Sequence, residues 1–119
     1  MKENILLEKS YNFALRIVKL CRYLNEEKQE FVISKQILYT GTSIGASVEA
    51  AQQGENRVDF ASKLSQANQY TFKTNFWLRL LRDGEFLSEA HAESILNDCE
   101  ELQKMLITAV KTAKSKSQN

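Results

Sequence analysis

Hydrophobic residues recur every three or four positions along most of the chain, which is the spacing of one face of an α-helix. In the first segment this face consists of Leu6, Phe13, Ile17, Leu20 and Leu24. Lysine, arginine and glutamate occupy most of the remaining surface, so the pattern predicts an amphipathic helix over about residues 3 to 25. The polar run 25–30 then interrupts the pattern and predicts a connection.

A second helical pattern covers about residues 34 to 53. Ser34 is a favourable N-cap residue, and Gly54 is a favourable residue just after the helix end. The apolar positions of this segment are Ile37, Ile44, Val48 and Ala51.

Two longer patterns follow. One covers about residues 57 to 82, with Asn56 as its N-cap and Gly84 after its end. The other begins at Ser88 and continues to about residue 113, with an apolar residue every third or fourth position. No alternation of polar and apolar residues typical of a strand is present, and no 30-residue repeat indicates a solenoid.

The four patterns together predict the fold. Proline, which helix interiors exclude, is absent from the chain. Helices joined by short connections are antiparallel neighbours, so the expected fold is all-α, an antiparallel up-down-up-down four-helix bundle. We expect one domain over residues 1–114 and a polar tail over residues 115–119 that frays.

Composition narrows the possible functions. The 119 residues include 16 Lys and Arg against 15 Asp and Glu, a net charge of +1, which excludes a strongly electropositive nucleic-acid binder. No uncharged stretch reaches the roughly 20 apolar residues that span a bilayer, and the N-terminus does not have the pattern of a secretory signal. We therefore expect a cytoplasmic protein with reduced thiols.

The residues that could carry chemistry do not form a catalytic set. His91 is the only histidine, and Cys21 and Cys99 both fall on apolar helix faces, as buried thiols do. The segment Thr40–Ser47 has the glycines of a phosphate loop, but they lie within a predicted helix and no lysine follows. The sequence therefore predicts a protein without enzymatic activity, metal or cofactor.

The second predicted helix is unusual because it contains many small residues and only two charges, Lys35 and Glu49. Each glycine inside it costs about 1 kcal/mol relative to alanine. Small side chains four residues apart let a neighbouring helix approach closely. That helix belongs either to the same bundle or to another subunit, and the scarcity of charge favours the subunit. The predicted oligomer-interface residues are Gly41, Ser43, Gly45, Ser47 and Ala50.

Basic residues of the first and third predicted helices allow a second interpretation. They are Arg16, Lys19, Arg22, Arg57, Lys63 and Lys73. Because acidic residues are interleaved with them, they indicate an ordinary solvated surface. The alternative is a one-sided basic strip that binds RNA or DNA phosphates.

The second and third segments also resemble a known family. Residues 41–50 read Gly-Thr-Ser-Ile-Gly-Ala-Ser-Val-Glu-Ala, and they are followed by Asp59-Phe60, Lys63-Leu64 and Trp77-Leu78. This combination resembles the four-helix-bundle proteins of the bacterial 23S rRNA intervening-sequence family. The resemblance implies a ring-like homo-oligomer, typically a pentamer, and a related branch accompanies the reverse transcriptase of diversity-generating retroelements, where a basic surface meets nucleic acid.

The chain departs from the family pattern at two positions. Tyr39 stands where the family often has arginine, and Ser47 stands where asparagine is usual. The missing arginine and the near-zero net charge weaken the expectation of nucleic-acid binding. A non-enzymatic homo-oligomer is therefore the first hypothesis, and an accessory protein that binds nucleic acid is the alternative.

Overall fold

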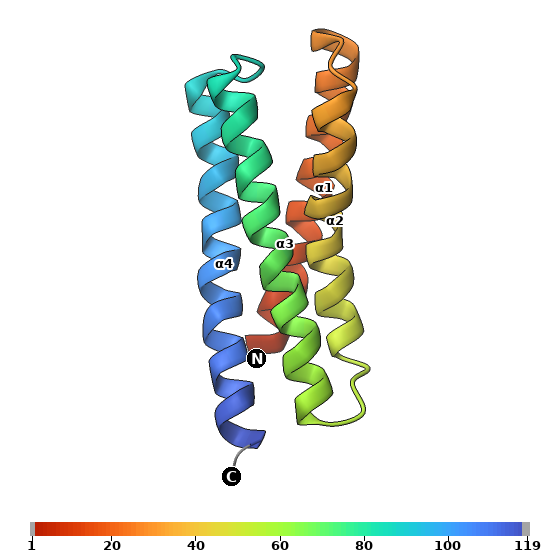
Figure 1. The fold of residues 1–119 in the computed structure, drawn as a ribbon, viewed down its shortest axis with the longest axis vertical. Coiled ribbons are helices and arrows are strands. Elements are labelled where there is room, and N and C mark those ends of the chain that lie inside the picture. The colour runs from red at the N-terminus through yellow and green to blue at the C-terminus, as the bar shows by residue number, and fades with distance from the viewer. Residues whose placement is uncertain (1, 118–119) are drawn as a thin grey trace.

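The computed structural model describes the backbone of residues 2–117 and the side chains of residues 5–116. It contains four helices: α1 (Lys2–Lys28), α2 (Val32–Ala51), α3 (Arg57–Asp83) and α4 (Glu89–Ser117). Consecutive helices run in opposite directions along a rod of 51 × 21 × 21 Å (Figure 1). The predicted all-α four-helix bundle is confirmed.

Each helix packs mainly against its neighbours in the chain. The contacts of α2 with α1, of α3 with α2, and of α4 with α3 are extensive, whereas α1 and α4 touch over a much smaller area. Across the described residues, α1 and α3 do not contact each other, nor do α2 and α4. These two pairs are therefore the diagonals of the bundle.

The core is built from the apolar positions that the helical periodicity indicates. Ile17 and Leu24 of α1, Ile44 of α2, Leu78 of α3 and Ile95 of α4 are fully buried. Burying a side chain of this size stabilises a fold by about 1.5–3 kcal/mol relative to leaving it exposed. A single apolar cluster thus runs along the whole bundle.

The start of α2 differs from the prediction. The helix begins at Val32 rather than at Ser34. Its N-cap residue is Phe31, whose side chain makes no capping hydrogen bond. Instead, the carboxylate of Glu30 accepts the backbone N–H groups of Val32, Ile33 and Ser34 at 3.1, 2.8 and 2.7 Å. The Ser34 hydroxyl donates to Asn25. The N-cap prediction for Ser34 was wrong because a longer acidic side chain reaches these amides from outside the helix.

The N-cap predicted at Asn56 is confirmed, and Ser88, where the fourth helix was predicted to begin, also caps its helix. The side chain of Asn56 accepts the N–H of Asp59 at 2.9 Å, and the hydroxyl of Ser88 accepts the N–H of His91 at 3.1 Å. Gly84 is the C-cap residue of α3, as the sequence indicated.

Helix α4 is longer than expected. It continues to Ser117, so residues 115–117 are helical and the predicted boundary at residue 114 falls inside a helix. Lys114 and Lys116 lie in its last turn, where positive charge interacts favourably with the helix dipole. Residues 118–119 of the predicted tail lie outside the described residues.

Candidate functional site

The small residues of α2 serve mainly to bring α1 close. A Cβ atom added to Gly41 would lie 2.7 Å from Cγ1 of Ile17, and one added to Gly45 would lie 3.1 Å from the carbonyl oxygen of Ser10. Both glycines are buried in the bundle. The helix that approaches them within the chain is α1, and their contact with another subunit stays a prediction.

The other predicted interface residues lie nearer the surface. Ser43 and Ser47 are half-buried and Ala50 is exposed. The hydroxyl of Ser43 donates to the carbonyl oxygen of Tyr39 at 2.6 Å, within its own helix. The contact of Ser43, Ser47 and Ala50 with another subunit stays a prediction.

A larger exposed apolar surface lies beside them on α2 and α3. We call it the aromatic patch, and it consists of Tyr39, Phe72, Phe76 and Trp77, which line one shallow hollow. Tyr39 is 61% exposed, Phe72 58% and Phe76 46%. Contiguous exposed aromatic side chains are typical of surfaces that bind other proteins.

Neighbouring contacts hold the aromatic patch in place. The hydroxyl oxygens of Tyr39 and Tyr70 are 3.1 Å apart, and their rings meet edge to face. This hydrogen bond raises the pKa of Tyr39. The ring of Phe76 packs edge to face on Trp77, with 5.2 Å between the ring centroids. The aromatic patch is therefore an ordered surface of the folded chain.

Sequence reasoning did not single out the aromatic patch. In the sequence, Phe72, Phe76 and Trp77 lie within the pattern that predicts the helix over residues 57 to 82. The spacing of Phe72, Phe76 and Leu80 held the missing signal, because residues four apart form a separate outer stripe. Leu80 is 40% exposed and extends the stripe by one turn.

The six basic residues are not gathered on one face. Arg16 forms an ion pair with Asp98 at 2.6 Å and donates to Ser94, on the side of α1 that faces α4. Lys63 pairs with Asp59 at 2.7 Å on α3. The amino group of Lys73 lies 5.5 Å from the centroid of the Tyr70 ring. Each of these cations already has a partner within the chain.

The other three basic residues are exposed. Lys19 and Arg22 are neighbours one turn apart on α1, whereas Arg57 lies at the start of α3, across the diagonal. A strip of all six residues would have to cover two helices on opposite corners of the bundle, and nucleic-acid binding through these residues stays a prediction.

Both thiols are buried, as the sequence predicted. Cys21 donates to the carbonyl oxygen of Ser34 and Cys99 to that of Thr71, at 3.3 and 3.4 Å. Desolvation raises the pKa of Cys21 to about 11 and that of Cys99 to about 12. Neutral buried thiols are poor nucleophiles, so these cysteines act as core residues.

No cluster of three or more potential metal-ligating side chains occurs among the described residues. The ring of His91 packs edge to face on Tyr23, with 6.0 Å between the ring centroids. Within the described part of the chain, none of the helices is both long and apolar enough to cross a membrane.

Comparisons with known proteins agree with the fold. A crystal structure from Bacteroides thetaiotaomicron VPI-5482, described as a protein with unknown function from the S23 ribosomal protein family, is 46% identical, with a TM-score of 0.92. The match covers 93% of this chain and 99% of that one. Curated proteins yield no match. The model of the 23S rRNA-intervening sequence protein family matches residues 2–108. The chain therefore belongs to the 23S rRNA-intervening sequence protein family.

Proposed function

We propose that the chain is a non-enzymatic subunit of a homo-oligomer and that the aromatic patch is its contact surface. The exposure of Tyr39, Phe72 and Phe76 is the observation that carries the proposal. Burying these rings against a second copy would remove a large apolar area from water, at about 25 cal/mol per Å². The resemblance to ring-forming family members, typically pentamers, supports the same conclusion.

The small residues at the surface of α2 fit this proposal. Ala50 and the neighbouring Ala46 are exposed on the outer side of α2, where short side chains would let a helix of a second copy approach. Tyr39 belongs to the same helix. One subunit contact that covers α2 and α3 together would thus use both features.

Light scattering coupled to size-exclusion chromatography tests the proposal. The wild-type chain should elute as a species several times 13.7 kDa. The double variant Phe72→Glu with Phe76→Glu should shift that species to a monomer, because four or more buried charges in one assembly are costly. Circular dichroism should show unchanged helicity, because both side chains are exposed in the isolated chain.

Val58→Glu is the matched control. Val58 is 68% exposed on α3 but lies at the opposite end from Phe76, so the assembly should tolerate a charge there. Ala50→Arg examines the small-residue surface separately and should also weaken assembly. A wild-type chain that remains monomeric at high concentration would refute the proposal.

Nucleic-acid binding is the less favoured function. Of the six candidate basic residues only Lys73 lines the aromatic patch, and the other five are spread over α1 and the first turns of α3. Binding that weakens steeply with added salt would be expected if phosphates were contacted.

A further inference from the structure

An apolar hollow lies at the end of the bundle where α1 begins. Its volume is 420 Å³, within the range of about 300–1,000 Å³ typical of small-molecule sites. It opens where α4 and the first turns of α3 extend past the start of α1 (Figure 1). The small α1–α4 contact leaves this end without a covering helix.

The lining is apolar within and cationic at its rim. Leu6, Phe60, Leu64 and Met105 are among the apolar residues, and the charged residues are Arg57, Lys104 and Lys116. No carboxylate occurs among the described side chains that line it, although the chain contains 15 acidic residues. A hollow with this lining favours an apolar ligand that carries negative charge.

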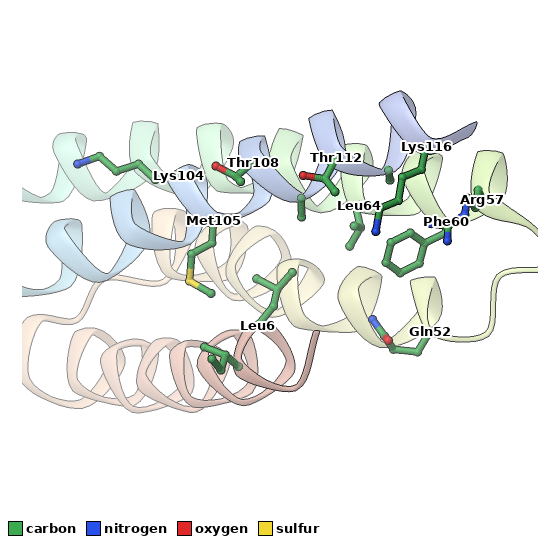
Figure 2. A pocket seen from close by; sticks show the side chains of 13 residues that line it. Leu6, Gln52, Arg57, Phe60, Leu64, Lys104, Met105, Thr108, Thr112 and Lys116 are labelled. Carbon is green, nitrogen blue, oxygen red and sulfur yellow. The ribbon is translucent and has the colours of Figure 1, made fainter. Parts of the chain in front are cut away.

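The charges have a defined position. Figure 2 shows Arg57 and Lys116 beside Phe60 at one end, Leu6 and Met105 towards the other, and Lys104 pointing away along α4. In the described part of the chain, neither Arg57 nor Lys116 takes part in an ion pair. Two cations without carboxylate partners therefore lie at one end of an apolar hollow. This arrangement suits a ligand with an anionic head group and an apolar tail.

We propose that this hollow binds a fatty acid, with its carboxylate between Arg57 and Lys116 and its acyl chain directed towards Met105. A guanidinium group binds a carboxylate through two parallel hydrogen bonds, and an ammonium group adds a second charge. The amide of Gln52 lies at the same end and can donate to the carboxylate. Each methylene buried along Leu64 and Met105 adds to the affinity through the hydrophobic effect.

Methyl NMR of the full chain labelled at methionine tests the proposal. The chain has two methionines, and the methyl group of Met105 lies in the hollow, so its resonance reports occupancy directly. Decanoate should shift this resonance saturably, and decanol, which has the same chain length without the charge, should bind about tenfold more weakly. The variant Met105→Leu assigns the resonance.

Charge variants separate the head site from the acyl site. Arg57→Gln with Lys116→Gln should lower decanoate affinity about tenfold and leave decanol binding unchanged. Lys19→Gln with Lys35→Gln removes the same charge from distant exposed positions and should leave both affinities unchanged. Because all four side chains are exposed, none of these changes should unfold the bundle.

Three results would overturn the proposal. The first is that decanoate does not shift the Met105 resonance, and the second is that decanol and decanoate bind equally well. The third is that the distant charge variant lowers decanoate affinity as much as the rim variant does. An acidic amphipathic peptide that shifts this resonance when decanoate does not would also overturn it, and would assign the hollow to a protein partner.

Discussion

Helix α1 has two neighbours that hold it in different ways. Against α2, its Ile17 and the backbone of Ser10 fill the space above Gly41 and Gly45, and the contact is close and buried. Against α4, the exposed ion pairs Lys9–Glu101 and Arg16–Asp98 join the two helices, and one end of the contact opens into the apolar hollow. The two sides of one helix therefore differ in both packing and polarity.

This difference follows from connectivity and from physical chemistry. The loop between α1 and α2 spans only a few residues, which forces those helices together, whereas α1 and α4 are joined only through the rest of the bundle. A partly exposed ion pair such as Arg16–Asp98 contributes about 0.2–1 kcal/mol in comparable proteins. The α1–α4 side is thus the weaker side, and it is the side that has room for a ligand.

The largest expected effect is on the rate of thiol labelling at Cys21, on the side of α1 that packs against α2. The pKa of Cys21 is about 11 instead of 9.0, so the folded chain contains about a hundredfold less thiolate than the unfolded chain near pH 8. A Cys99→Ala variant, which leaves Cys21 as the only thiol, should react with a disulfide reagent at least that much more slowly when folded. Its rate should rise as pH increases from 8 to 10, because the thiolate fraction increases.

Cys99 provides the internal comparison. Its pKa is about 12, so a Cys21→Ala variant should react more slowly still. If Cys21 reacted as fast in the folded chain as in denaturant, the α1–α2 contact would open readily, and the contrast between the two sides of α1 would be wrong.

Filling the space at Gly41 should give the second-largest effect. Gly41→Val places new atoms against the fully buried Ile17, and overpacking of this kind costs about 1–3 kcal/mol. Urea unfolding monitored by circular dichroism measures the loss. Valine has a lower intrinsic helix propensity than alanine but a higher one than glycine, so propensity alone predicts a gain.

Ser62→Val is the matched control, since Ser62 is exposed within α3 and belongs to neither proposed site. It should cost less than about 1 kcal/mol. Adding Ile17→Ala to Gly41→Val should recover part of the stability by removing the clashing atoms. Equal losses for Gly41→Val and Ser62→Val would show that the close approach of α1 is unimportant.

Local patterns explain how much of this fold the sequence predicts. The cap at Asn56 and the start of the fourth helix at Ser88 were predictable because each capping side chain and the amide it accepts lie three residues apart. The cap on α2 was missed because Glu30 is a longer side chain and precedes the N-cap position.

The candidate surfaces depend on the order of helices around the bundle, which the periodicity does not contain. Gly41 and Gly45 indicated a close neighbour but not that it was α1. Arg16 and Lys63 could be listed as basic, yet their separation and their carboxylate partners depend on which helices are adjacent. The proposed fatty-acid site likewise combines residues of α1, α3 and α4 with Gln52, which follows α2, and depends on the unequal positions of the helix ends.

Removing the cap on α2 should have a moderate effect. Glu30 is only 8% exposed and its carboxylate accepts three backbone N–H groups, so Glu30→Ala should destabilise the chain by about 1–2 kcal/mol. Glu30→Gln keeps one acceptor oxygen and should lose less. Glu27→Ala, an exposed change in the preceding turn, should be nearly neutral, and a larger loss there than at Glu30 would contradict the capping role.

The smallest expected effect is the coupling energy of the Arg16–Asp98 pair, on the side of α1 that faces α4. The guanidinium of Arg16 lies 2.6 Å from the carboxylate of Asp98, but the two side chains are 31% and 50% exposed, so water screens the pair. A double-mutant cycle of Arg16→Met and Asp98→Asn should give a coupling of about 0.2–1 kcal/mol. The coupling should decrease in 1 M salt, where the screening length is about 3 Å. A salt-independent coupling as large as the loss from Gly41→Val would mean that α4 holds α1 as firmly as α2 does. The α1–α4 side would then lack the weakness that we associate with its ligand-sized opening.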